Sequence, residues 1–308
     1  MVIKMGKIAL MFSGQGAQYS GMGRELYEGS QAARELFDLA ESLRPGTLEQ
    51  CFSGSAEELA ITENTQPCVF CVDLAAALAL KEKGIDADIL AGFSLGEVAA
   101  LASSGAVSYE TGFKLVCTRA KLMQKASEAV ITGMAAVLKL SDEKVISLCN
   151  EFDGMYPVNF NCDGQVVVAG AKDKLEEFII RVKEEGGKAM PLKVGGGFHS
   201  PFMASASDSF SEILREIDIK NPEVPLYSNM TAKVYEGDMK ELLAKQIRNP
   251  VMWKVAVENM IADGVDTFIE AGPGKTLCGL VSRISKDVRV FSVEDMAGLE
   301  ATCKAVLA

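Results

Sequence analysis

The sequence has little positive charge, little histidine and no long apolar stretch. Its 308 residues include 31 lysines and arginines against 42 aspartates and glutamates, which gives a formal net charge of −11. Binding to nucleic-acid phosphates needs a positively charged face, so this balance excludes a nucleic-acid partner. The longest helical apolar stretch, Cys68–Leu80, is interrupted by Asp73. It is shorter than the roughly 20 residues that span a bilayer, so we predict no transmembrane segment and no membrane partner.

The N-terminus bears on the location of the protein, and the cysteines bear on its core. Met1–Leu10 carries two lysines and runs into the turn Ser13–Gly16, without a small-residue cleavage site. We therefore expect a first core strand here and a cytoplasmic location. The eight cysteines lie mostly in apolar periodic segments, where a thiol acts as a small hydrophobe. Cys68 and Cys71 form a lone C-x-x-C pair with no second pair or nearby histidine, so we assign them to core packing and expect no metal.

Short apolar runs alternate with helical segments along most of the chain. We expect strands at 7–12, 88–93, 224–227, 265–270 and 288–291, and helices at 65–80, 95–103 and 109–128, the first of them capped at Thr65 and buried on all sides. This alternation is typical of a mostly parallel sheet. The fold class we predict for the main body is therefore α/β.

A different rhythm occupies the middle of the chain. Strand, helix, two paired strands, helix and strand are expected at 134–140, 141–150, 155–161, 165–170, 173–185 and 188–194. This is the β-α-β-β-α-β order of ferredoxin-like folds. A chain of 308 residues is also longer than most single cores. We therefore predict a small inserted domain at 129–196.

The segment Gly92-Phe93-Ser94-Leu95-Gly96 fits the pattern G-x-S-x-G. The glycines of this pattern let a strand turn sharply into a helix and hold the serine hydroxyl above the sheet. The pattern alone is weak, because it arises by chance in roughly one chain in ten of this size. Here an expected strand precedes it and an expected helix follows. We therefore interpret Ser94 as a nucleophile, with a structural strand-to-helix turn as the alternative.

A serine hydroxyl attacks only when a base accepts its proton, and His199 is the single histidine of the chain. Three glycines and Phe198 precede it, and Ser200-Pro201 follow as an expected helix cap and first-turn proline. We interpret His199 as the base and expect activity to rise with pH near the ordinary histidine pKa of about 6.5. The alternative is a hydrogen-bonded histidine without a catalytic role.

The groups around the serine and the histidine are less distinct. No acid between them in the chain stands in a recognisable motif, which leaves a main-chain carbonyl to orient the imidazole. An oxyanion hole would combine the amide of Leu95 with one from the Gly14-Gln15-Gly16 turn.

Arg119 lies in an expected helix beside apolar neighbours at Leu115, Leu122 and Met123. Most arginines in such a setting extend to the surface or bridge an acid. A bidentate clamp on a carboxylate is the other interpretation, because it suits the planar guanidinium. Spacing alone leaves both open.

Seven segments follow one another in an order that resembles one enzyme family. They are Phe12–Gln18, Gly92–Glu97, Thr118–Gln124, Asn159–Asn161 with Gly164–Val166, Phe198–Pro201, Asn249–Trp253 and Glu270–Gly274. Together they resemble the successive motifs of malonyl-CoA:acyl carrier protein transacylases, from about residue 8 to 290. Such an ordered series is far more specific than any one motif.

The resemblance implies a role for each matching residue. Ser94 would be the acylated nucleophile and His199 its base. The amides of Gln15 and Leu95 would form the oxyanion hole, and Arg119 would bind the malonyl carboxylate. The remaining implied positions are Gln66 in the pocket wall, Phe198 as the bulky residue linked to malonyl over methylmalonyl, and Met252, near which a carbonyl would orient His199.

The resemblance also implies a fold and a reaction. An α/β-hydrolase-like parallel-sheet domain, residues 1–128 and 197–308, would carry the ferredoxin-like insertion at 129–196. Malonyl would pass from malonyl-CoA through an ester on Ser94 to the phosphopantetheine thiol of acyl carrier protein, by a ping-pong mechanism, and supply fatty acid biosynthesis. No cofactor and no metal are implied. A monomer suits an enzyme that a mobile carrier visits.

Two acidic partners would need a basic rim despite the negative net charge. Basic residues in segments next to the motifs are candidates, with ordinary solvated surface charge as the alternative. They are Lys188, Lys193, Arg248, Lys254, Lys275, Arg283 and Lys286.

Two departures and three alternatives remain. Family members often have histidine where Phe93 stands and a polar residue where Met252 stands; we expect both changes to leave the chemistry intact. A stand-alone acyltransferase of a polyketide pathway, a serine thioesterase and a non-catalytic carrier-protein docking module are the alternatives. Arg119 favours a transferase over a thioesterase, because a carboxylate clamp suits malonyl and an ordinary thioesterase needs an apolar channel.

Overall fold

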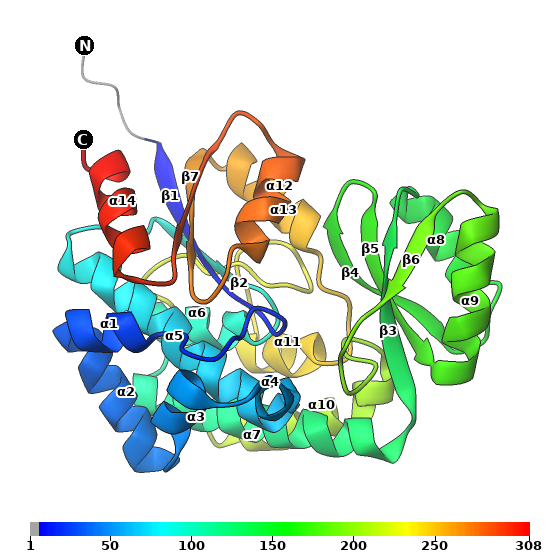
Figure 1. Cartoon of the computed structure of the whole chain (residues 1–308), viewed down its shortest axis with the longest axis horizontal. Helices are drawn as coiled ribbons and strands as arrows, with labels where there is room; N and C mark the ends of the chain where they lie inside the picture. Colours follow the sequence, from blue (N-terminus) through cyan, green and yellow to red (C-terminus); the bar gives the residue numbers. More distant parts are fainter. Residues whose placement is uncertain (1–5) are drawn as a thin grey trace.

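The first sheet of the computed structural model, which describes residues 6–308, is parallel throughout (Figure 1). Its strand order is β2-β1-β7-β8. The strands are β1 (Lys7–Phe12), β2 (Ile89–Gly92), β7 (Val265–Ala271) and β8 (Arg289–Val293). The prediction of an α/β body with a parallel sheet is therefore confirmed.

Two details of this sheet differ from the sequence-based expectation. The segment 224–227 is not a strand: Leu226 forms only an isolated bridge with Leu90, because the preceding Pro225 has no N–H to extend the ladder. At the other end of the sheet, β1 begins at Lys7. Residues 1–5 of the expected first strand lie outside the described residues.

Helices cover both faces of the parallel sheet. On one face, Ile8, Leu10 and Phe12 of β1 pack with α5 and α7; on the other, Ala9 and Met11 pack with α12 and α13. This alternation follows from the two-residue period of a strand. The helices of this part are α1 (Arg24–Gly29), α2 (Gln31–Leu43), α3 (Thr47–Ser53), α4 (Ala56–Ala60), α5 (Thr62–Glu82), α6 (Gly96–Ser103), α7 (Tyr109–Ala129), the 3-10 turn η1 (Pro201–Met203), α10 (Ala204–Arg215), α11 (Met239–Gln246), α12 (Trp253–Ala262), α13 (Thr276–Ile284) and α14 (Met296–Val306).

The long helix α5 runs through the core and is buried around most of its circumference, as predicted. It begins at Thr62, not at Thr65, so Pro67 lies inside the helix. The hydroxyl of Thr65 donates to two carbonyls of the preceding turn, which ties α5 to α4 and leaves no cap at that position. Cys68 and Cys71 are fully buried in this helix, which confirms their assignment to packing.

The second sheet is antiparallel, with the order β4-β5-β3-β6. Its elements are β3 (Thr132–Leu138), α8 (Asp142–Cys149), β4 (Met155–Cys162), β5 (Gln165–Ala171), α9 (Lys172–Glu184) and β6 (Lys188–Pro191). The predicted β-α-β-β-α-β order and its ferredoxin-like strand arrangement are present. The division of the chain into separate domains at 129 and 196 stays a prediction.

The two faces of the second sheet have different neighbours. Ala135 and Val137 of β3 pack under α8 and α9, which lie on the side turned away from the first sheet in Figure 1. Met134 and Ala136 point the other way and join the apolar core of the main body. A cleft can therefore form between the two sheets. Within residues 6–308, no helix combines the length and the apolar character needed to cross a bilayer.

Candidate active site

Ser94 occupies a strained turn between β2 and α6, at the carboxyl edge of the parallel sheet. Its φ of 56° lies in the left-handed region, which costs a non-glycine residue about 1–3 kcal/mol. A Cβ on Gly92 would lie 2.0 Å from the carbonyl group of Gly96, and a Cβ on Gly96 would lie 2.3 Å from the carbonyl oxygen of Phe12. Both positions therefore require glycine, and the turn projects the serine hydroxyl out of the sheet.

His199 lies directly against this serine. The distance from its Nε2 to Ser94 Oγ is 2.7 Å, and its Nδ1 lies 2.9 Å from the backbone carbonyl oxygen of Gln246. Because a carbonyl can only accept, Nδ1 carries the proton of the neutral ring and donates it to Gln246. Nε2 is then left with a lone pair that faces the serine hydroxyl. The arrangement has the geometry of a nucleophile and its base.

The electrostatic setting keeps this imidazole neutral. His199 is 4% exposed. Burial, followed by the positive charge of Arg119, lowers the pKa of His199 to about 4 from its ordinary value of 6.5. The expectation of a titration near pH 6.5 is therefore wrong, because it ignored desolvation. At neutral pH the ring is in the form that can accept a proton.

The carbonyl that orients the histidine lies earlier in the chain than expected. The expected acceptor lay near Met252, but the carbonyl of Met252 accepts from Ala256 in the first turn of α12. The acceptor is Gln246, the last residue of α11. The last carbonyls of a helix have no partner inside it, so the Gln246 carbonyl, which also accepts from the backbone N–H of Asn249 at 3.4 Å, can bind the imidazole. The prediction that a main-chain carbonyl, and not an acidic side chain, orients His199 is confirmed.

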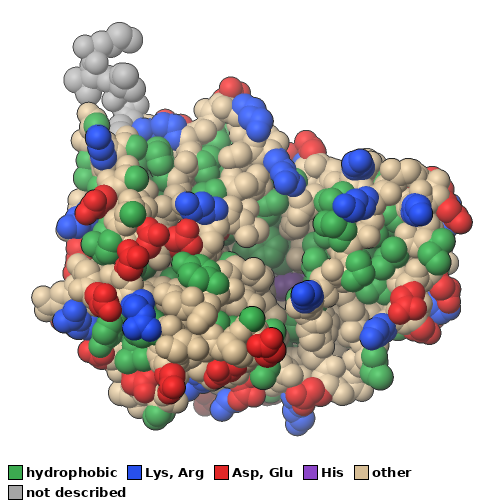
Figure 2. All heavy atoms as spheres, in the orientation of Figure 1, with side chains coloured by type: hydrophobic (Ala, Val, Ile, Leu, Met, Phe, Trp, Pro, Cys, Tyr) green, Lys and Arg blue, Asp and Glu red, His purple; other side chains and the backbone are tan. Residues whose placement is uncertain are grey.

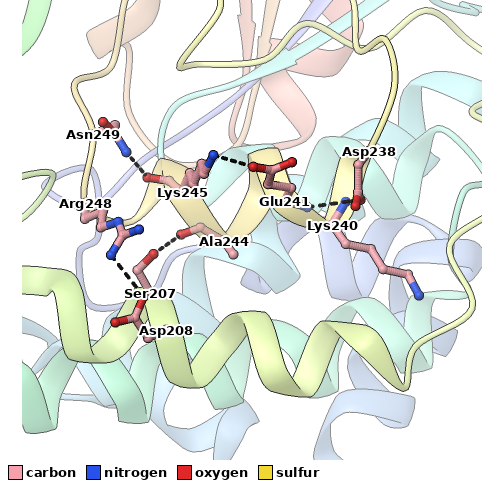
Figure 3. A network of polar contacts seen from close by, with 9 residues as sticks. All are labelled: Ser207, Asp208, Asp238, Lys240, Glu241, Ala244, Lys245, Arg248 and Asn249. Carbon is pink, nitrogen blue, oxygen red and sulfur yellow. Dashed lines mark hydrogen bonds and ion pairs between the residues drawn. The ribbon is translucent and has the colours of Figure 1, made fainter.

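The end of α11 is fixed to α10 by side-chain contacts (Figure 3). Ser207 donates to the carbonyl of Ala244 at 2.7 Å, and Arg248 pairs with Asp208 at 2.9 Å. Asn249 donates to the carbonyl of Lys245 at 2.8 Å. Three consecutive carbonyls at this helix end thus have a partner each, the third being His199 on Gln246.

Arg119 of α7 is 1% exposed and reaches the serine from the other side. Its Nη1 donates to Gln66 Oε1 at 2.6 Å, and its Nη2 donates to Gln246 Oε1 at 2.8 Å and to Ser94 Oγ at 3.1 Å. These partners are all uncharged. Burial lowers the pKa of Arg119 to about 10, and the charge of Glu97 opposes this shift. At neutral pH the pocket therefore contains a cation whose hydrogen-bond partners carry no charge.

Two amide side chains that the motifs did not single out hold the backbone of the nucleophile. Asn229 accepts from the Ser94 amide at 2.7 Å and donates to the carbonyl of Gly92 at 2.5 Å. Gln246 donates to the carbonyl of Ser94 at 2.7 Å. Neither residue stands in a distinctive local pattern.

The proposed oxyanion donors lie on the wall of the serine pocket. Gln15 follows β1 and Leu95 follows the serine, and both line the pocket. Within the described part of the chain, neither backbone amide has a hydrogen-bond acceptor. The turn before Gln15 is fixed by a hydrogen bond from the backbone N–H of Ser13 to the buried carboxylate of Asp73 at 3.2 Å. Two amides are thus available for an oxygen that develops negative charge.

The serine pocket opens into a larger cavity of about 640 Å³ between the two sheets. Figure 2 shows this face hollowed between them, with the histidine colour at the bottom of the hollow. Phe198 lines the pocket, and Phe93 lines both spaces while its ring packs 5.5 Å from that of Trp253. Asn159 and Asn161 line the cavity, and their Oδ1 atoms have no hydrogen-bond partner within residues 6–308.

Comparisons with known proteins find relatives that match nearly the whole chain. The acyl transferase domain family matches residues 10–302. A malonyl CoA-acyl carrier protein transacylase of Bacillus subtilis is 40% identical over 304 residues, which cover 96% of each chain. One from Staphylococcus aureus is 36% identical, covering 95% of this chain and 97% of the relative.

Solved structures resemble the whole chain. The malonyl CoA-acyl carrier protein transacylase of Clostridium perfringens superimposes with a TM-score of 0.94 at 37% identity and covers 98% of this chain and 97% of its own. A malonyl-transacylase solved in complex with its type II PKS acyl-carrier protein has a TM-score of 0.93 at 32% identity, covering 97% and 99%.

Proposed function

The chain belongs to the acyl transferase domain family and, within it, to the malonyl CoA-acyl carrier protein transacylases, and from this we propose that it transfers malonyl from malonyl-CoA to the phosphopantetheine thiol of acyl carrier protein through an ester on Ser94. The observation that carries the proposal is the contact of three groups in one pocket. Ser94 Oγ lies 2.7 Å from His199 Nε2 and 3.1 Å from Arg119 Nη2.

Acylation begins with malonyl-CoA in the cleft. His199 Nε2 takes the proton of Ser94 Oγ while that oxygen attacks the thioester carbonyl. The carbonyl oxygen becomes an oxyanion, for which the amides of Gln15 and Leu95 are the donors. When the tetrahedral intermediate collapses, the C–S bond breaks and the CoA thiolate takes the proton from His199. The malonyl group then remains as an ester on the serine.

The second half-reaction reverses these roles with a different thiol. After CoA has left, the phosphopantetheine arm of the carrier enters the cavity and His199 takes its thiol proton. The thiolate attacks the ester, the C–O bond to Ser94 breaks, and the serine recovers the proton from His199. The apolar cavity fits such an arm.

Arg119 is the reason for proposing malonyl as the acyl group. A buried cation with only uncharged partners is incompletely compensated, and the free carboxylate of a malonyl group would compensate it. The guanidinium lies beside Ser94 Oγ, so a carboxylate one carbon away from the reacting carbonyl can reach it. Within the described residues, Arg119 forms no ion pair of its own.

A transfer assay tests the proposal against thioester hydrolysis. The purified chain is mixed with malonyl-CoA and a holo acyl carrier protein, and the carrier is weighed by mass spectrometry. We expect malonyl-carrier protein to form in amounts matching the CoA released. Release of free malonate with an unmodified carrier would instead indicate a thioesterase.

We place the reaction in fatty acid biosynthesis, the role expected from the resemblance. A polyketide pathway is the second candidate, because one structural neighbour was solved with a type II PKS acyl-carrier protein. Transfer rates to a fatty-acid carrier and to a type II polyketide carrier, measured side by side, separate the two. A preference for the fatty-acid carrier is expected.

A further inference from the structure

Glu97 is a buried carboxylate beside the nucleophile for which the reaction above has no use. It lies on the first turn of α6, three residues after the nucleophile, and is 0% exposed. Three groups donate to it: the side-chain Nε2 of Gln246 at 2.8 Å, the backbone N–H of Asn229 at 3.3 Å, and the hydroxyl of Tyr235. A buried carboxylate is retained only where such partners compensate its desolvation. Its contacts therefore indicate what it does.

The partners of Glu97 are the residues that hold the catalytic groups. Gln246 is a hub: its side chain donates to the carbonyl of Ser94 and accepts from Arg119, and its backbone carbonyl binds His199. Asn229 binds the amide of Ser94. Glu97 thus reaches each of these groups through one intermediate residue.

A glutamine side chain can present its amide in two orientations. In the observed orientation Nε2 donates to both Glu97 and the Ser94 carbonyl, while Oε1 accepts from Arg119. The flipped orientation would place Nε2 against the guanidinium, donor against donor, and Oε1 against two acceptors. Arg119, the Ser94 carbonyl and the Glu97 carboxylate therefore all favour the observed orientation, and a donor at position 97 would oppose it.

We propose that Glu97 is a positioning residue: it fixes the side chain of Gln246 in the single orientation that serves Ser94, Arg119 and His199 together. The carboxylate touches no substrate and transfers no proton in this role. Its negative charge also partly compensates Arg119, which raises the pKa of that arginine against the effect of burial. Burial in turn raises the pKa of Glu97 to about 7, while its three donors and Arg119 lower it.

Glu97→Gln is the direct test, because it preserves shape and replaces one acceptor oxygen by a donor. Misplacement of reacting groups by about 1 Å can cost about 100-fold, so we expect kcat to fall by about 10-fold to 100-fold for malonyl-CoA and for any acyl donor the enzyme accepts. The KM for malonyl-CoA should not rise. Burst titration should still show one reactive serine per chain, since a merely structural defect would lower the active fraction and leave the kcat of the remainder unchanged.

A double-mutant cycle shows whether Glu97 acts through Gln246. Gln246→Ala removes the side chain and keeps the carbonyl on His199. In that background, Glu97→Gln should lower kcat by less than about 3-fold, because the side-chain amide that Glu97 orients is gone. An equal cost in both backgrounds would overturn the inference. If Glu97→Gln does not fold, Tyr235→Phe replaces it in the same cycle, since it removes one donor to the carboxylate and is expected to give a smaller loss with the same dependence on Gln246.

This inference rests on the proposed function, and the two can fail separately. A wild-type chain that transfers no malonyl contradicts the proposed function. A wild-type chain that does so, with a Glu97→Gln kcat equal to its own, contradicts only the role of Glu97.

Discussion

At the scale of single residues, the proposed function predicts that Arg119 selects the acyl group. Acetyl lacks the carboxylate of malonyl and would leave the buried guanidinium uncompensated, an asymmetry worth about 2–4 kcal/mol, or about 30-fold to 1000-fold. Arg119→Ala should therefore lower kcat/KM for malonyl-CoA sharply and change the value for acetyl-CoA little. Arg119→Lys keeps the charge without the planar guanidinium, so its kcat/KM for malonyl-CoA should lie between those of the wild type and Arg119→Ala. An equal loss for both substrates would make the arginine structural.

The depressed pKa of His199 predicts an unusual pH profile. Only the neutral ring can accept the serine proton, and burial lowers its pKa to about 4. The fraction of neutral His199 should therefore stay high as pH falls through about 6.5, where an ordinary histidine is protonated, and should decline only near pH 4. The measurement is kcat/KM for malonyl-CoA against pH. Glu97, with a pKa raised to about 7, is protonated as the pH falls through this range, so a loss of activity near pH 7 that is absent from the Glu97→Gln profile belongs to Glu97 and not to His199. A histidine limb near 6.5 would contradict the burial argument.

The residues that sequence reasoning located share one property: their chemistry is bound to a local pattern. Ser94 lies in a glycine-flanked turn, and His199 is the only imidazole. Gln246 and Asn229 act through ordinary side-chain amides and a helix-end carbonyl, which leave no local pattern. The shift from Met252 to Gln246 has the same cause, because the free carbonyl depends on where α11 ends and not on residue type.

At the scale of elements, the turn from β2 to α6 depends on close backbone contact. A Cβ on Gly96 would lie 2.3 Å from the carbonyl oxygen of Phe12. We expect Gly96→Ala to lower the free energy of unfolding by about 1–3 kcal/mol and to reduce acyl transfer. Gly279→Ala in α13 is the matched control, because nothing lies within 4 Å of its added Cβ; it should be neutral or slightly stabilising. Chemical denaturation measures both, and equal effects would mean that the turn tolerates a side chain.

Elements were predictable where their periodicity was strong. The order of strands and helices along the chain in the second sheet, and the buried character of α5, followed from apolar spacing alone. The start of α5 and the segment 224–227 did not, because each depends on a neighbour: the turn that Thr65 binds, and the ladder that Pro225 interrupts.

At the scale of the whole molecule, the charge distribution bears on docking. Of the expected basic residues, Arg248 pairs with Asp208, and Lys254 pairs with Asp142 and Asp163. These pairs leave less charge for a partner. Lys193 lines the cavity, and Arg283 donates to the cavity residue Gln165. We call Lys193 and Arg283 the basic rim.

Transfer to the carrier should depend on this rim and on salt. Reversing Lys193 and Arg283 to glutamate should lower kcat/KM for the carrier by about 10-fold at low salt, and added salt should weaken wild-type transfer, since steering is screened beyond about 8–10 Å at physiological ionic strength. Lys304→Glu on α14 is the control, because this exposed lysine lies on the opposite part of the molecule from the second sheet (Figure 1). A rate indifferent to salt and to both reversals would exclude the rim.

The covalent ester on Ser94 is the claim on which the account depends most, and intact mass spectrometry tests it directly. The chain is mixed with malonyl-CoA without any carrier protein and quenched in acid. One malonyl group per chain is predicted, mapped to the peptide containing Ser94. No adduct is expected on Ser94→Ala, and a full adduct is expected on Ser104→Ala, which changes the buried serine that follows the C-terminal end of α6. An unmodified wild-type chain that still transfers malonyl, or an adduct retained by Ser94→Ala, would contradict it.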